Sequence, residues 1–147
     1  MTLIEKTKNL APEEIDSIDV LLEEGDMRVQ TTLMVGHVLG PAVPPAEAYY
    51  ERALQLGISD PEKEFKARYG LGTFLALNWD KKGAIPHLQR AIELKPNDYN
   101  SRFVMGKLYE DTGRFAEASR EFLKAASVGR SPRSLYRSFT NWIKTVL

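Results

Sequence analysis

The sequence contains no cysteine and only two histidines among its 147 residues. Without cysteine the chain can form no disulfide, thiolate metal site or cysteine nucleophile, although this absence leaves the cellular compartment open. The histidines, His37 and His87, lie far apart and outside any HExxH pattern, so a zinc site would need an unusual ligand set. We therefore expect neither a metal nor a cofactor.

An excess of charge of one sign is also missing, because 20 lysines and arginines balance 20 aspartates and glutamates. Nucleic acids and anionic membranes attract a basic face, so neither is an expected partner. Residues 31–46 lack Asp, Glu, Lys and Arg, but this run is shorter than the roughly 20 apolar residues of a membrane span, and Pro41, Pro44 and Pro45 interrupt it. Residues 1–8 carry charges where a signal peptide would be apolar, so we expect a cytoplasmic protein without membrane insertion.

The most informative feature that is present is an internal repeat. Shifting the chain by 34 residues superposes residues 65–94 on residues 99–128 without a gap. Apolar residues recur at helical spacing within each unit, and a polar turn at 78–80 or 111–113 divides the unit in two. Each unit is therefore predicted to be a helical hairpin. Identical residues coincide at four positions, which pair Arg68 with Arg102, Gly72 with Gly106, Ala84 with Ala118 and Ala91 with Ala125.

The repeated small residues have a steric explanation. With almost no side chain at Gly72 and Ala84, two antiparallel helices can approach closely while larger neighbours interlock. Leucine at either position should force the hairpin apart.

This pattern resembles the tetratricopeptide-repeat (TPR) family, whose 34-residue unit places small, apolar and proline residues at fixed positions. The second unit matches with Leu71, Gly72, Ala84, Leu88, Ala91 and Pro96, and the third with Met105, Gly106, Tyr109, Ala118, Phe122 and Ala125. Trp79 occupies a turn position that is usually glycine. The resemblance implies an all-α fold, a right-handed α-solenoid of about three TPR-like helical hairpins with N- and C-terminal flanking helices.

Residues 1–147 are then one TPR-like domain with five parts. An amphipathic helix over residues 12–24, ending at Gly25, belongs to an N-terminal helical cap at 1–25. A degenerate repeat 1 occupies 26–57, repeat 2 occupies 61–96 and repeat 3 occupies 99–130. A C-terminal capping helix follows at 131–147. The first helix of repeat 1 should carry Val35, Gly36 and Leu39, and its second helix Ala46, Tyr50 and Ala53.

No pattern of catalytic residues is recognisable, so we expect that the protein is not an enzyme. Gly70 and Gly72 superficially resemble a phosphate loop, but they lie inside a helical pattern without a preceding strand. The acidic clusters lack the twelve-residue loop of a calcium site and are interpreted as solvated helix faces.

By the same resemblance, a concave groove lined by the first helices of the hairpins holds a protein or peptide ligand. Tyr69 and Phe103 would be its apolar anchors, although both rings could instead only cover the core. A possible second surface, which would support a homo-oligomer through the C-terminal helix, consists of Tyr136, Phe139 and Trp142. The groove positions are Lys66, Tyr69, Thr73, Leu77, Asn100, Phe103, Lys107, Glu110 and Asp111.

The expected function is that of a protein–protein interaction adaptor or scaffold in the assembly or targeting of a complex. Two alternatives stay open, because a fold does not define a partner. The chain could be a secretion-type or client-specific chaperone, or a non-catalytic subunit of an enzyme complex.

Overall fold

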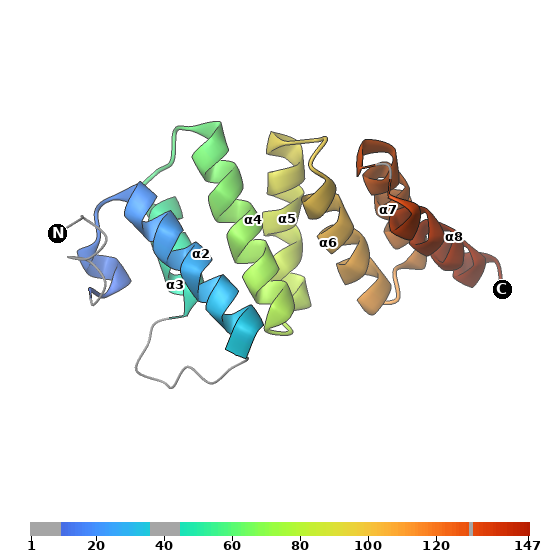
Figure 1. The fold of residues 1–147 in the computed structure, drawn as a ribbon, viewed down its shortest axis with the longest axis horizontal. Coiled ribbons are helices and arrows are strands. Elements are labelled where there is room, and N and C mark those ends of the chain that lie inside the picture. The colour runs from blue at the N-terminus through green and yellow to red at the C-terminus, as the bar shows by residue number, and fades with distance from the viewer. Residues whose placement is uncertain (1–9, 36–44, 130) are drawn as a thin grey trace.

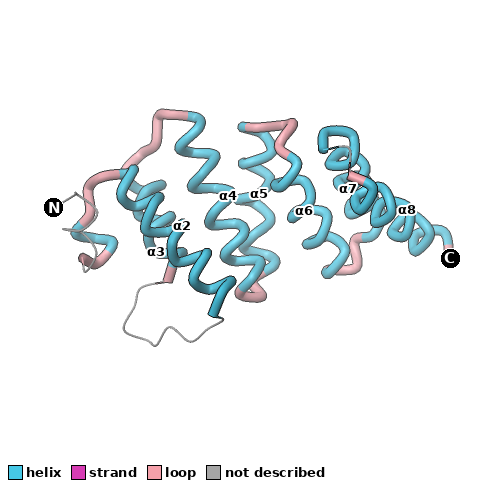
Figure 2. The backbone as a smooth tube through the Cα atoms, viewed as in Figure 1, coloured by secondary structure: helices cyan, strands magenta, loops and turns pink. Residues whose placement is uncertain are grey.

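The computed structural model describes residues 10–35, 45–129 and 131–147, with side chains given up to residue 30 and from residue 45 onward. Over these ranges the protein is all helical, without a strand, which confirms the expected fold class. The helices stand side by side in one elongated array, with α2 and α3 towards one end and α8 at the other (Figure 1). Short connections join the helices of the second and third hairpins (Figure 2). No helix in the described part is long and apolar enough to cross a membrane.

Two complete hairpins form the centre of the array. Helices α4 (Pro61–Leu77) and α5 (Lys81–Leu94) make one, and α6 (Tyr99–Asp111) and α7 (Phe115–Gly129) make the other. Aspartates cap three of these helices: the Asp60 carboxylate accepts from the Glu62 backbone N–H at 2.9 Å, Asp80 from Gly83 at 2.9 Å and Asp98 from Ser101 at 2.7 Å. Each cap satisfies an N–H group that has no partner in the first helical turn.

The glycines inside the hairpins stand where the helices approach closely. A Cβ atom on Gly72 would lie 2.7 Å from Cγ of Leu88 in α5, and one on Gly106 would lie 2.8 Å from Cε1 of Phe122 in α7. Neither distance leaves room for a side chain, because real Cβ atoms do not come so near another carbon. The steric reason proposed from the repeat is confirmed.

The turns of the two hairpins share one backbone conformation but differ in residue type. Trp79 has a φ of 68° and Gly113 has a φ of 75°. Both are left-handed values, which cost a residue with a side chain more than they cost glycine. Trp79 therefore occupies a glycine position at an energetic cost, and its ring is largely exposed.

The first hairpin differs from its prediction. Residues Pro12–Glu14 form only a short 3-10 turn, η1, and the helix predicted to end at Gly25 instead runs on as α2 (Ile18–Val35). The predicted boundary between cap and repeat 1 thus falls inside a helix. Gly25 does not end α2 because its role is steric: a Cβ there would lie 2.8 Å from the ring of Tyr50.

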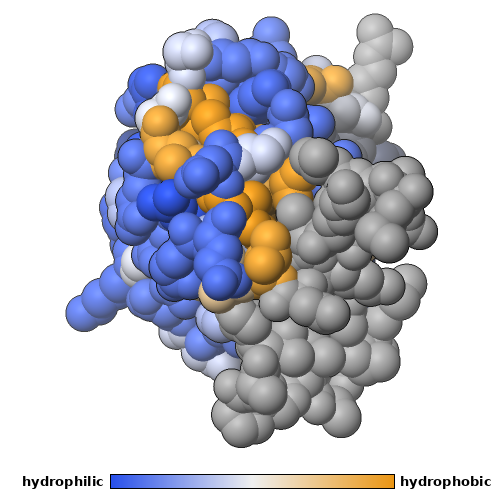
Figure 3. Space-filling model, turned by 90° about the vertical axis from the view of Figure 1, so that its left-hand side faces the viewer, coloured by the Kyte–Doolittle hydropathy of each residue, from blue (hydrophilic) through white to orange (hydrophobic). Residues whose placement is uncertain are grey.

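Helix α3 (Ala46–Gln55) completes this hairpin and confirms the predicted second helix, since Ala46, Tyr50 and Ala53 are all buried on it. Val35 ends α2, whereas the predicted helical residues Gly36 and Leu39 lie outside the described part of the chain. Figure 3 shows the N-terminal end of the array, where a band of apolar atoms runs between polar ones. Exposed large apolar residues in this part of the chain are Leu10 and Met27.

Helix α8 (Pro132–Val146) closes the described array against α7, as a C-terminal helix over 131–147 predicts. A cap is expected to turn an apolar face inward and a polar face outward. Helix α8 does the reverse, because Ser134, Ser138 and Asn141 are buried while Phe139 and Trp142 are exposed. It therefore covers α7 without ending the array in a polar surface.

Candidate protein-binding groove

A cleft of about 210 Å³ lies between α4 and α6, the first helices of the two complete hairpins. Helices α4 and α6 contact each other directly, although α5 separates them along the chain. The walls of the cleft are mainly apolar, with charged groups at one end. The lining residues are Thr73, Ala76 and Leu77 from α4 and Phe103, Val104, Lys107, Leu108 and Asp111 from α6.

The structure brings together five of the nine predicted groove residues in this cleft, namely Thr73, Leu77, Phe103, Lys107 and Asp111. Glu110 lies beside them and contacts Lys107. Tyr69 does not line the cleft. Lys66 is exposed on the second turn of α4 and Asn100 on the first turn of α6, whereas the cleft lies along the later turns of these helices, so neither is brought into the cleft.

Phe103 both packs on the core and lines the cleft. Its ring stands edge-on to Phe122 at 5.4 Å between centroids and stacks on Tyr99 at 5.7 Å. The guanidinium groups of Arg133 and Arg137 lie 5.4 Å and 6.0 Å from the ring centroid. Phe103 is therefore a rigid apolar surface that neighbouring residues hold in place.

Tyr69 is different. It is half-buried against the core and stacks on Phe65 at 5.8 Å between ring centroids. Burial raises the pKa of the Tyr69 phenol, which therefore stays neutral near physiological pH. Both rings pack against the core, and of the two only Phe103 also lines the cleft.

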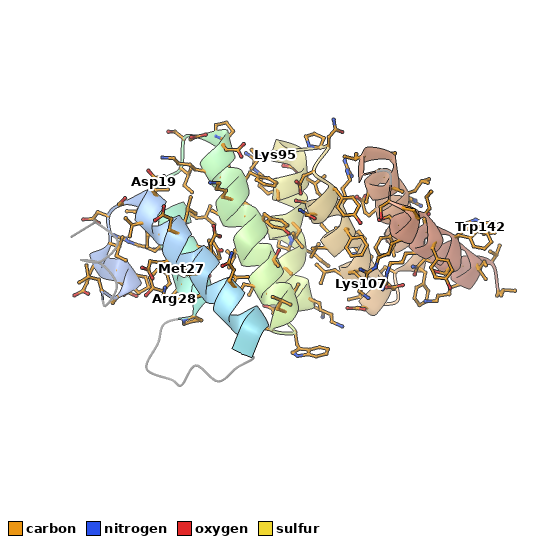
Figure 4. The ribbon with its side chains drawn as sticks, viewed as in Figure 1. Asp19, Met27, Arg28, Lys95, Lys107 and Trp142 are labelled. Atoms are coloured by element: carbon orange, nitrogen blue, oxygen red, sulfur yellow. The ribbon has the colours of Figure 1, made fainter. Side chains whose placement is uncertain are left out.

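Charges of both signs meet at one end of the cleft. The Lys107 ammonium donates to Glu110 Oε2 at 2.9 Å and to Asp111 Oδ1 at 3.3 Å. Glu110 also accepts from Asn141 at 2.9 Å and pairs with Arg137, both of α8. Burial raises the pKa of the Glu110 carboxyl, but these hydrogen bonds outweigh it and lower the pKa, so Glu110 stays charged. Figure 4 shows Lys107 at this end of α6.

One polar group in the wall of the cleft is the buried hydroxyl of Thr73. It interacts with the Tyr69 phenol, and this hydrogen bond opposes the rise in the Tyr69 pKa that burial causes. The cleft therefore offers an apolar floor and a charged end.

Sequence reasoning missed the contribution of α8 to this region. Shifting the repeat once more places Arg137 on the position of Phe103 and Asn141 on that of Lys107. The continued 34-residue period was the signal that could have found them. Val104 and Leu108 were also missed, because the family's groove positions do not include them.

The comparisons with known proteins support the repeat and the fold. Residues 99–128 match the family model described as tetratricopeptide repeat. No curated protein matches the sequence. The structure resembles that of YrrB, described as a TPR protein with an unusual peptide-binding site, with a TM-score of 0.67 and 23% identity over 88% of this chain and 61% of that chain.

Structures of MamA are also similar. One has a TM-score of 0.71 and 21% identity over 94% of this chain and 70% of that chain. Another has a TM-score of 0.70 and 18% identity over 99% of this chain and 94% of that chain. The chain is thus shorter than the proteins it matches and spans less than two thirds of YrrB. These likenesses confirm the TPR solenoid fold and the resemblance to the TPR family.

Proposed function

We propose that the cleft between α4 and α6 binds a segment of a partner protein and that the chain acts as an adaptor in the assembly or targeting of a complex. The TPR fold supports protein–protein interaction in general. The observation that carries the specific proposal is the position of Phe103, which Tyr99 and Phe122 hold rigid while its ring lines an apolar cleft. A preformed anchor site reduces the entropy lost on binding.

The cleft also indicates what the segment should look like. An apolar side chain would enter between Leu77 and Phe103. Lys107 and Asp111 at the charged end would set the register and the association rate. This role needs no catalytic step. YrrB is described as binding a peptide, which agrees with the proposal without identifying the ligand of this chain.

The test uses two exposed leucines as a matched pair. Leu77 lines the cleft and Leu123 is exposed on α7 outside it. Peptides selected from a random library on the wild-type chain are measured by fluorescence anisotropy against Leu77→Asp and Leu123→Asp. We expect Leu77→Asp to weaken binding about 30-fold, which corresponds to a hot spot of about 2 kcal/mol. Leu123→Asp should leave binding unchanged.

Equal loss in both variants, or no loss in either, would reject the cleft as the site. Circular dichroism of both variants controls for folding. The selected motif can then be used to find partners, and stoichiometric co-purification with a catalytic chain would distinguish an enzyme-complex subunit from an adaptor.

A further inference from the structure

A second cavity, of about 420 Å³, lies between α6 and α8. Helix α6 contributes Glu110 to its wall, and α8 contributes four residues that recur at spacings of three, one and three positions. This spacing places the four on one face of α8, apart from the exposed apolar side that carries Phe139 and Trp142. The four residues of α8 are Arg133, Tyr136, Arg137 and Thr140.

The cavity is next to the cleft, and residues of α6 connect the two. The Phe103 ring, which lines the cleft, has its centroid 5.4 Å from the Arg133 guanidinium and 6.0 Å from that of Arg137. Lys107 also lines the cleft, and it donates at 2.9 Å to Glu110 in the wall of the cavity. A protein segment bound in the cleft therefore needs only to cross α6 to reach the cavity.

Positive charge is in excess around the cavity. Lys107 and Arg137 pair with the Glu110 carboxylate, and the Lys144 ammonium lies 4.0 Å from it. One carboxylate thus has three cationic neighbours. Arg133 adds a fourth cation, and it forms no ion pair with any residue in the described part of the chain. A second carboxylate, supplied by a ligand, would be attracted to this surplus.

Hydrogen-bond donors remain available at the same place. Arg137 donates to Glu110 through Nη1, while its Nε and Nη2 groups make no hydrogen bond with a described residue. The Arg133 guanidinium makes none within these ranges either. Tyr136 is 70% exposed, and a phenol can donate a hydrogen bond to an anion. Since one guanidinium can give two parallel hydrogen bonds to a carboxylate, these groups suit an acidic side chain.

Arg137 is also held in position before any ligand arrives. Its guanidinium lies 6.0 Å from the centroid of the Phe103 ring and 5.7 Å from that of Phe122, and its ion pair with Glu110 holds it on the third side. Groups that are already fixed lose less entropy when a ligand binds.

We propose that this cavity binds an aspartate or glutamate side chain of the same protein segment whose apolar side chain enters the cleft. The inference rests on the function proposed above and defines the partner further. Arg133 makes the main contact, because it has no carboxylate of its own, and Arg137 adds to it. The chain as a whole has no net charge, so the surplus is local and suits one carboxylate instead of a nucleic-acid backbone.

The geometry also predicts the spacing within the bound segment. Two residues of extended chain cover about 7 Å, and side chains two positions apart point to the same side. This length is similar to the 5.4 Å and 6.0 Å between the Phe103 ring and the two guanidinium groups. We therefore expect the acidic residue about two positions from the apolar anchor.

The test uses peptides selected on the wild-type chain from a random library in which each peptide is fused to its carrier at the C-terminus. Synthetic copies have an amidated C-terminus, so only side-chain carboxylates contribute. Each acidic residue of a selected peptide is replaced in turn by glutamine, and dissociation constants are measured by fluorescence anisotropy. We expect one replacement, about two positions from the anchor, to weaken binding to the wild-type chain about tenfold, as for the loss of a hydrogen bond to a charged group.

Two arginine variants form a matched pair for this measurement. Arg133→Gln removes the charge at the cavity, whereas Arg120→Gln removes one on the exposed face of α7, outside the cleft and the cavity. The glutamine replacement should cost less than about threefold in Arg133→Gln and still about tenfold in Arg120→Gln. A peptide with lysine in place of the acidic residue should bind Arg133→Glu more tightly than it binds the wild-type chain. Circular dichroism controls for folding.

Leu77→Asp separates this inference from the proposed function. Peptides that lose affinity with Leu77→Asp but tolerate every glutamine replacement would leave the cleft as the site and overturn the acidic contact alone. An equal cost of the glutamine replacement in Arg133→Gln and wild type would place the peptide carboxylate elsewhere and also overturn it. If no peptide is selected, or if Leu77→Asp has no effect, the proposed function fails and this inference fails with it.

Discussion

Replacing Gly70 with alanine should destabilise the protein, although alanine is the better helix former. Gly70 is buried inside α4, and a Cβ atom there would lie 2.4 Å from Cζ and 2.6 Å from the hydroxyl oxygen of Tyr50 in α3. Tyr50 is only 1% exposed. Its hydroxyl donates to Asp26 at 2.6 Å, and a Cβ atom on Gly25 of α2 would lie 2.8 Å from its ring. One tyrosine thus joins three helices, two of them through glycine.

The magnitude follows from two opposing effects. Alanine in place of Gly70 gains about 1 kcal/mol of helix propensity. Overpacking costs about 1–3 kcal/mol, and the upper end applies because Tyr50 is buried and hydrogen-bonded and cannot swing away. We expect a net loss of about 2 kcal/mol in the free energy of unfolding. With Tyr50→Leu the outer ring atoms are gone, and Gly70→Ala should then stabilise that variant by about 1 kcal/mol.

Urea denaturation followed by far-UV circular dichroism measures the four proteins of this double-mutant cycle. The expected coupling energy between the two positions is about 3 kcal/mol. Tyr50→Leu alone should be destabilising, because it loses the Asp26 hydrogen bond and packed volume. If Gly70→Ala changed stability by the same amount with tyrosine or leucine at position 50, close packing against the ring would not be the reason for the glycine.

Two further predictions concern the second hairpin. Trp79→Gly should raise the free energy of unfolding by about 1 kcal/mol in urea titrations. The reason is that Trp79 has a φ of 68° at the position where the next hairpin has Gly113. An unchanged or lower free energy of unfolding would show that this conformation carries no strain. Burial and the charge of Arg68 lower the pKa of His87, so the folded protein prefers the neutral imidazole. The stability contributed by the neutral imidazole is complete above the usual histidine pKa of 6.5 and is lost as the pH falls below that value. His87→Gln should therefore reduce the loss of unfolding free energy between about pH 8 and about pH 5, measured by urea denaturation at each pH. An unchanged dependence on pH would contradict this assignment.

Much of the central fold could be predicted because its determinants are local. Asp60 and the following proline mark the start of α4 through a cap, and Gly72 and Gly106 mark the close contacts within each hairpin. These signals recur with the repeat, so each unit confirms the other. The groove was predicted less completely. The family positions indicate which face of each first helix lines the groove, but not how many turns of that face form the cleft. Lys66 and Asn100 lie on the correct helices but nearer their N-terminal ends, away from the cleft.

The two complete hairpins, their turns and the existence of α8 could be predicted from the sequence, because caps, glycines and helical periodicity act between residues close in the chain. The other features depend on contacts between helices that are distant in the chain. Gly25 has the sequence signature of a helix end, yet it lies inside α2 because Tyr50 of another helix needs the space. The apolar side of α8 is evident from its periodicity, but periodicity does not state which side meets the array. Close approach and hydrogen bonding between Ser119 and Ser138 set that orientation, and both depend on residues brought together only by folding.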